Sequence, residues 1–155
     1  MRRLTSEILR ASAVSPAEIS LFTTLGGDVA FSEAFCRAHA SKFDWTTWGT
    51  RLLSSAALTR FVSEMLQHWL ECRGVEREAA SNYSEASEEA WRHYQSEFML
   101  NAWDKFCAVE SQARRQYLKA LREARRERLK RTAIAFHRAW ASMEDQHQDS
   151  MEASS

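Results

Sequence analysis

Apolar residues recur at intervals of three and four along most of the chain, the spacing that places side chains on one face of an α-helix. Between residues 45 and 73 the pattern is carried by Trp45, Trp48, Leu52, Leu58, Phe61, Val62, Met65, Leu66 and Trp69. It predicts one helix of medium length that begins after Asp44 and is ended by Gly74. Asp44 is a natural N-cap, and we expect Trp45 and Trp48 to anchor the start of this helix.

A second and longer apolar line begins near Ser84, after a polar connection at residues 76–84, and continues to about Met143. No glycine or proline interrupts it, so the pattern predicts a helix over residues 84–143, on the order of 90 Å long if unbroken. A compact domain of this size is only about 30 Å across. We therefore expect the helix to project from its domain and to bury Phe136 and Trp140 against another chain.

The first forty residues predict short helices. Residues 15–18, Ser-Pro-Ala-Glu, offer a capping serine, a proline suited to the first helical position and a glutamate that completes a capping box. Gly26 and Gly27 end this helix, and Asp28 caps a second one that ends near Ser41. The expected fold is all-α, with short N-terminal helices, one medium helix and one very long C-terminal helix in an elongated, coiled-coil-like helical hairpin.

Three parts of the chain differ in composition. Residues 1–14 are amphipathic, rich in arginine and poor in acids, with Leu4, Ile8 and Ala11 on one helical face. We expect this segment to be an uncleaved mitochondrial targeting signal, the alternative being a short surface helix. Residues 15–143 form the helical domain with its projecting helix. Residues 144–155 form an acidic polar tail, which we expect to be disordered in isolation.

Charge is balanced over the whole chain but not along it. Lys+Arg and Asp+Glu both total 21, so the net charge gives no reason to expect nucleic acid or an anionic membrane as a partner. Residues 76–110 are nevertheless mainly acidic, whereas residues 114–131 are strongly basic. Blocks of this kind indicate interaction faces. The arginines expected to contact a partner are Arg114, Arg115, Arg122, Arg125 and Arg126.

Motifs for chemistry are weak. The pairs with metal-ligand spacing are Cys36–His39, His68–Cys72 and Glu144–His147. None has the further ligands that a zinc or di-iron site requires, and no nucleophile elbow or phosphate-binding loop is present. Three widely spaced cysteines suggest buried free thiols rather than a disulfide framework. We expect no metal, no cofactor and no catalytic activity, and a small helical enzyme or metal-binding bundle is the third-ranked hypothesis.

One stretch resembles a known family. It contains Phe43, Asp44, Trp45, Trp48 and Leu52, followed by Leu58, Phe61, Val62, Leu66 and Trp69. This pattern, over about a third of the chain, resembles the Asp-Trp helix of subunit d of the mitochondrial F-type ATP synthase. The resemblance implies a non-catalytic subunit of the peripheral stalk that packs long helices against other subunits. It implies that the protein lies on the matrix side of the inner membrane and is held there only through the complex. No apolar run in the chain approaches the roughly 20 residues of a membrane span.

The alternative hypothesis is an accessory protein of the mitochondrial ribosome. In that case the basic helix over residues 114–131 contacts RNA phosphates rather than an acidic protein. Both hypotheses use the same set of expected partner-binding residues. These are Asp44, Trp45, Trp48, Arg114, Arg115, Arg122, Arg125, Arg126, Phe136 and Trp140.

Overall fold

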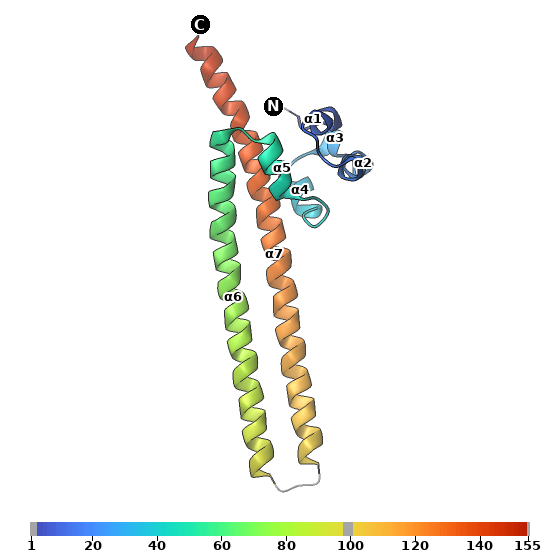
Figure 1. Ribbon diagram of the computed structural model, residues 1–155, viewed down its shortest axis with the longest axis vertical. Coiled ribbons are helices and arrows are strands. Elements are labelled where there is room, and N and C mark those ends of the chain that lie inside the picture. Colours follow the sequence, from blue (N-terminus) through green and yellow to red (C-terminus); the bar gives the residue numbers. More distant parts are fainter. Residues whose placement is uncertain (1–2, 98–100, 155) are drawn as a thin grey trace. The chain divides into compact units, whose positions relative to one another are not determined.

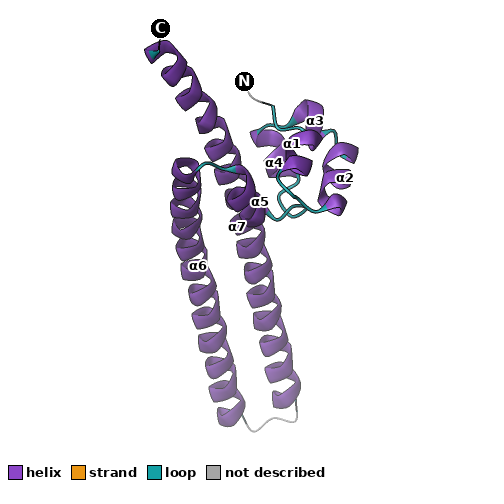
Figure 2. Ribbon diagram, turned by 45° about the horizontal axis from the view of Figure 1, so that its top comes forward, coloured by secondary structure: helices purple, strands orange, loops and turns teal. Residues whose placement is uncertain are grey.

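A computed structural model describes the backbone of residues 3–97 and 101–154, and the side chains of this part except those of residues 144–153. All regular structure in the described residues is helical (Figure 2), which confirms the all-α class. The helices are α1 (Ser6–Ala11), α2 (Pro16–Thr24), α3 (Gly27–Ala30), α4 (Glu33–Ala38), α5 (Trp45–Leu52), α6 (Ser55–Ser96) and α7 (Ala102–Ala153).

The chain divides into two compact units. Unit 1 contains Met1–His68 and Arg128–Ser155, and unit 2 contains Trp69–Glu127. Helices α6 and α7 pass from one unit into the other, so each unit holds part of both. Unit 1 therefore combines the short helices with the beginning of α6 and the last part of α7.

Helices α1 to α4 gather together in unit 1 (Figure 1). Each is shorter than the roughly 12 residues at which an isolated helix becomes marginally stable, so packing must hold them. Side-chain caps help: the Thr5 hydroxyl accepts from the Ile8 N–H, and the Ser32 hydroxyl accepts from the Phe35 N–H. Their apolar side chains join one buried cluster that also includes residues from α5, α6 and α7.

The amphipathic segment at residues 1–14 is part of this cluster. Leu4 and Leu9 are completely buried, whereas Ala11 is exposed. The Asp28 carboxylate accepts a hydrogen bond from the Ser6 N–H at 2.6 Å. Asp28 therefore holds the first helix in place instead of capping the second, and the expected face of Leu4, Ile8 and Ala11 is wrong in its last member.

The predicted medium helix is two helices. The chain leaves α5 at Leu53, whose backbone is extended (φ −87°, ψ 143°). The Ser54 hydroxyl then accepts from the Ala57 N–H at 3.4 Å at the start of α6. Apolar residues on both sides of this break keep the same spacing, so periodicity alone did not reveal it.

The expectation that Gly74 ends a helix is wrong, and so is the polar connection at residues 76–84. Helix α6 continues to Ser96. A β-carbon added at Gly74 would meet nothing within 4 Å, so this glycine serves no turn and no close approach. Its cost in an exposed helix, about 1 kcal/mol relative to alanine, is offset by packing on either side. The predicted helix over residues 84–143 is likewise wrong, because α6 ends at Ser96 and a separate helix, α7, begins at Ala102.

In unit 2, α6 and α7 lie side by side and antiparallel (Figure 1). The rings of Tyr83 and Tyr117 stack with centroids 5.4 Å apart, and those of Trp91 and Phe106 lie 5.6 Å apart. Small buried residues on α7 complete the contact between the two helices, which we call the seam. They are Ala102, Ala113 and Ala124. Their spacing of eleven residues is close to three whole helical turns, which keeps them facing α6 without strong supercoiling.

The acidic tail is also helical, because α7 extends through Ala153. The expected disorder of this tail is therefore wrong for the backbone of residues 144–153, and residue 155 lies outside the described residues. This segment contains neither glycine nor proline, and its glutamate, glutamine, methionine and alanine residues favour continuation of a helix.

Candidate partner-binding surfaces

Asp44 acts as the helix cap that its sequence context predicts. Its carboxylate accepts hydrogen bonds from the Thr47 N–H at 3.2 Å and from the Thr47 hydroxyl at 2.7 Å. The side chain is exposed, but its hydrogen-bonding capacity is used at the start of α5. Its role in the structure is to fix the direction in which Trp45 and Trp48 enter the core.

Both tryptophans are core residues. Trp45 is 2% exposed and Trp48 is fully buried. The Trp45 indole N–H donates to the Ala40 carbonyl at 2.8 Å, and the Trp48 indole N–H donates to Glu18 Oε2 at 3.1 Å. The same glutamate oxygen accepts from the Asp44 backbone N–H at 2.9 Å. These side chains leave no surface for a partner.

The expectation that another chain buries Phe136 and Trp140 is wrong. Phe136 is fully buried and Trp140 is 3% exposed within unit 1. The Phe136 ring lies 5.5 Å from Trp45 and 6.2 Å from Phe61, measured between ring centroids. The reason is that α6 continues past Gly74 and α7 runs antiparallel to it. Phe136 of α7 therefore packs against Trp45 and Phe61, and Trp140 joins the same core cluster.

The five expected arginines are on the surface of α7 and none of them is buried. Within the described residues their side chains make no hydrogen bond or ion pair. Arg115, Arg122 and Arg126 follow one another at intervals of seven and four residues, which places them on one face of the helix together with Lys119. We call this the basic edge of unit 2. Arg114 and Arg125 lie on an adjoining face.

Helix α6 carries the opposite charge. Glu78, Glu85 and Glu88 are exposed, share one face by their spacing, and make no ion pair within the described part of the chain. We call this the acidic edge of unit 2. The acidic block at residues 76–110 was its signal in the sequence, but block composition alone did not identify which glutamates share a face.

A second feature missed at the sequence level is an aromatic cluster near the ends of α6 and α7 in unit 2. It consists of Trp91, Tyr94, Trp103 and Phe106, with ring centroids 5.3–5.9 Å apart. Trp91 is 45% exposed and Trp103 is 51% exposed. Two large rings left half in water form an apolar patch of the kind that marks interaction surfaces.

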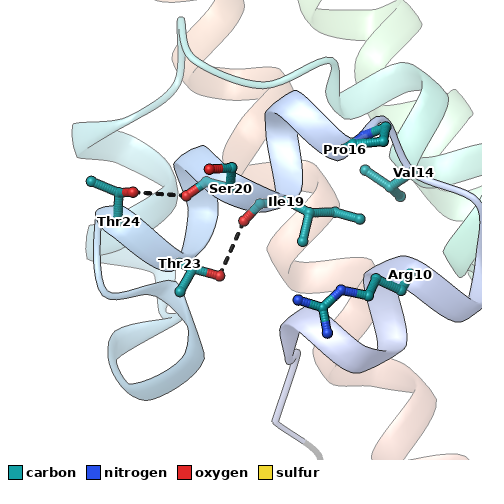
Figure 3. Close-up of a pocket in the computed structure, with 7 residues that line it drawn as sticks. All are labelled: Arg10, Val14, Pro16, Ile19, Ser20, Thr23 and Thr24. Carbon is teal, nitrogen blue, oxygen red and sulfur yellow. Dashed lines mark hydrogen bonds between the residues drawn. The ribbon is translucent and has the colours of Figure 1, made fainter.

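Surface hollows occur in the described part of the chain. One, of about 560 Å³, is lined by residues of α1, α2 and their connection (Figure 3). The hydroxyls of Thr23 and Thr24 donate to the carbonyls of Ile19 and Ser20, one turn earlier in the same helix. Arg10 is its only charged lining residue. The lining contains no nucleophile paired with a base.

The cysteine and histidine pairs do not gather into a metal centre. Among the described residues no group of three or more His, Cys, Asp and Glu side chains could hold a metal ion. Burial, together with the Glu33 carboxylate, raises the pKa of the Cys36 thiol well above its usual range. Cys36 is therefore a protonated core residue, poorly suited to ligation or attack. The side chains of Glu144 and His147 lie outside the described residues.

His137 makes the stability of unit 1 depend on pH. Burial lowers its pKa, an effect only partly opposed by the Glu33 carboxylate. Its Nε2 atom is buried with no hydrogen-bond partner among the described residues, and its ring lies 5.5 Å from Phe31. Because the unfolded chain binds this proton more readily, stability is complete above the unfolded pKa, about 6.5, and is lost as pH falls toward the folded pKa.

We therefore expect the chain to melt at a lower temperature below pH 6.5 than at pH 7.5, measured by circular dichroism. The variant His137→Phe should lose part of this dependence, whereas His93→Phe, at an exposed position on α6, should keep it. Equal pH dependence in both variants would show that His137 is not the responsible group.

The fold and these surfaces together define a class of protein. It is all-α, with an aromatic core in unit 1 that the chain completes by itself and a charged, partly apolar helix pair in unit 2. Comparison of the chain with protein-family models, with curated proteins and with solved structures gives no match. In the described residues, no helix combines the length and the apolar character needed to cross a membrane.

Proposed function

We propose that the protein is a non-catalytic structural subunit that joins a larger assembly through unit 2. The observation that carries this proposal is the pair of half-exposed tryptophans, Trp91 and Trp103. Burial of their exposed apolar area against a partner would stabilise the complex by about 25 cal/mol per Å². The neighbouring rings of Tyr94 and Phe106 cover only part of them. The charged edges on either side would select the partner and fix its register.

The assembly we propose is mitochondrial, and specifically the peripheral stalk of the F-type ATP synthase on the matrix side of the inner membrane. Support comes from the resemblance of the Asp44–Trp45–Trp48 segment to subunit d, and from the long charged helices available for lateral packing. In this proposal the Asp44–Trp45–Trp48 segment packs in the core of unit 1, and unit 2 makes the contacts to neighbouring subunits.

Native gel electrophoresis of mitochondrial extracts tests this proposal. We expect the tagged chain to migrate with the ATP synthase, and we expect its depletion to reduce the amount of intact complex. The double variant Trp91→Ala/Trp103→Ala should be lost from the complex. Val29→Ala, which shortens a side chain 82% exposed in unit 1, is the matched control and should remain. Migration of the wild-type chain apart from the complex would refute the proposal.

The basic edge supports a second candidate function, RNA contact in a mitochondrial ribosome. Its exposed arginines make no ion pair within the described residues and are free to contact phosphates. If this function holds, the purified chain should bind RNA with an affinity that falls steeply as salt rises. The variant Arg115→Glu/Arg122→Glu/Arg126→Glu should abolish binding. A lack of RNA binding at physiological salt would exclude it.

A further inference from the structure

The seam divides the surface of unit 2 into two unlike faces. In an antiparallel pair of right-handed helices, the residue after a seam position points to one side of the pair on both helices, and the residue before it points to the other side. Among the described residues of unit 2, five are buried, namely Cys72, Ala90, Ala102, Ala113 and Ala124. Each is followed by an arginine or a tryptophan, in the order Arg73, Trp91, Trp103, Arg114 and Arg125. We call their side of unit 2 the tryptophan–arginine face.

The opposite face carries acidic and amide side chains. The residues before the same five buried positions are Glu71, Glu89, Asn101, Gln112 and Glu123. Glu89 and the exposed Val109 line a hollow of about 350 Å³ on this side, and Gln116 lines a second hollow of about 150 Å³. The positions next to the seam are therefore divided by charge, with arginines on one face and acids on the other.

The tryptophan–arginine face is positively charged. Arg73, Arg114 and Arg125 are exposed, and within the described part of the chain their side chains make no hydrogen bond or ion pair. Two glutamates adjoin this face, Glu76 and Glu110, but both are half-buried because their spacing places them at the seam. Guanidinium groups pair well with carboxylates, often through two parallel hydrogen bonds. The charge on this face therefore selects an acidic partner.

The same face is also apolar. Trp91 and Trp103 are 45% and 51% exposed, and Leu118, which follows the half-buried Tyr117, is 43% exposed. Half-buried seam positions extend the face along α6 by Arg77 and, in its middle, by small side chains, namely Ala80, Ser84 and Ser87. A partner must therefore supply apolar groups as well as carboxylates, and it can approach α6 closely in the middle of the face.

Basic and apolar groups alternate along this face. Tyr83 stacks on Tyr117 in the antiparallel pair, so residues of α6 before Tyr83 lie level with residues of α7 after Tyr117. From the start of unit 2 toward the end of α6, the levels are an arginine pair, a leucine pair, a single arginine and a tryptophan pair, formed by Arg73 with Arg125, Leu118 with Leu121, Arg114, and Trp91 with Trp103. At 1.5 Å per residue, the two arginine levels are about 18 Å apart, and an apolar level lies about 10–12 Å beyond each.

We propose that this face binds an acidic amphipathic helix of another protein, laid along the seam so that it forms a three-helix bundle with α6 and α7. Residues seven and eleven positions apart share one face of an α-helix and lie about 10 Å and 16 Å apart, close to the spacing of the levels. The partner segment therefore has two acidic residues about eleven positions apart, each followed about seven positions later by an apolar residue. Its acids meet the arginine levels, and its apolar residues meet the leucine and tryptophan levels. Docking of a helix by such regularly spaced anchors is a common mode of recognition.

The order of the groups favours a helix over other occupants. A nucleic-acid strand carries a charge on every nucleotide, whereas the arginine levels here are about 18 Å apart with leucines between them. A bilayer takes up apolar side chains, whereas Ser84 and Ser87 occupy the middle of this face. A second copy laid face to face would bring arginines close to arginines, which costs free energy.

This inference rests on the proposed function, because it names the kind of partner that binds the surface through which unit 2 joins an assembly. The two can fail separately. A purified chain that binds acidic helices but migrates apart from the ATP synthase would refute that assembly and leave the inference standing. A chain that joins the complex but binds no acidic helix would do the reverse.

Fluorescence anisotropy with two labelled peptides of about 20 residues tests the proposal on the purified full chain. Both peptides have a background of alanine and glutamine, which favours a helix, and leucines at the two apolar positions. One has glutamates at the two charged positions, and the other has lysines. We expect the wild-type chain to bind the glutamate peptide at least about tenfold more tightly than the lysine peptide, with an affinity that falls as salt rises.

Matched variants locate the binding. Arg114→Gln/Arg125→Gln removes two positive charges from the tryptophan–arginine face, and Gln112→Glu/Gln116→Glu lowers the net charge by the same amount on the opposite face of α7. We expect the first variant to bind the glutamate peptide at least about tenfold more weakly and the second to bind it as the wild type does. Arg73→Glu/Arg114→Glu/Arg125→Glu should reverse the preference and bind the lysine peptide.

Several results would overturn the proposal. One is a wild-type chain that binds neither peptide up to about 100 μM, or binds both equally; another is equal binding of the glutamate peptide by the two matched variants. The others identify a different occupant: oligouridine that displaces the glutamate peptide at a lower concentration than unlabelled peptide does, phosphatidylglycerol vesicles that retain the wild type but not Arg114→Gln/Arg125→Gln, or a wild-type dimer in sedimentation velocity that Trp91→Ala/Trp103→Ala converts to monomer.

Discussion

Replacing Phe136 with alanine is expected to lower the free energy of unfolding by about 3–5 kcal/mol, a large fraction of the total stability of an ordinary domain. The Phe136 ring is fully buried and lies against Trp45, Trp48 and Phe61. Its removal would leave a cavity that these rigid rings cannot fill. Urea titration followed by circular dichroism measures the change, and the control Val29→Ala should alter stability by less than about 0.5 kcal/mol.

The size of this effect separates two accounts of the last part of α7. If Phe136 belongs to the chain's own core, the loss appears in the purified protein without any partner. A loss below about 1 kcal/mol would mean that the side chain is not packed in the isolated chain, and burial of Phe136 on another chain would again be the better explanation.

The second large effect is expected at Glu18. One of its carboxylate oxygens accepts from both the Asp44 backbone N–H and the Trp48 indole N–H. The variant Glu18→Ala would leave the fully buried Trp48 without this acceptor. Because an unsatisfied buried donor costs about 1–3 kcal/mol, we expect a loss of roughly 2 kcal/mol, measured by the same urea titration.

Glu18→Gln is the matched control. The glutamine side chain keeps an oxygen of the same reach and so can still accept both hydrogen bonds. It should retain at least half of the stability that alanine loses. Equal losses in the two variants would show that negative charge at Glu18, rather than the position of the acceptor, holds α2 to the start of α5.

Local signals in the sequence predicted local structure well. Pro16 begins α2, and Asp44 caps α5 at the predicted position. The capping box was wrong in one detail: Ser15 makes no side-chain cap hydrogen bond. The Glu18 carboxylate instead reaches a residue 26 positions later, and no local pattern specifies such a contact.

The errors in the second half come from the same limit. Gly74 and the polar residues after it resembled a helix end, but their free-energy cost is small compared with the seam that α6 forms with α7. Conversely, nothing in the composition around Ser96 indicated a turn. Because the sequence does not reveal this break between helices, it does not reveal that Phe136 and Trp140 pack in the chain's own core, and their apolar side chains suggest a partner that they do not need.

The surface of unit 2 was predicted only in outline. The basic block correctly indicated exposed arginines on α7, because a run of like charges cannot be buried. The exposure of Trp91 was not foreseen, since this residue fits the apolar line of one long helix as well as it fits the outside of a helix pair. Only the position of the turn distinguishes a seam residue from its exposed neighbour.

The chain completes one aromatic core by itself and leaves a second apolar surface for association. Acrylamide quenching of variants that each keep a single tryptophan tests this division most directly. The quencher should not reach Trp48 in the purified, folded protein, whereas it should reach Trp91 and Trp103. Quenching of Trp48 in the folded chain would contradict the account, as would a Trp91 that the quencher cannot reach.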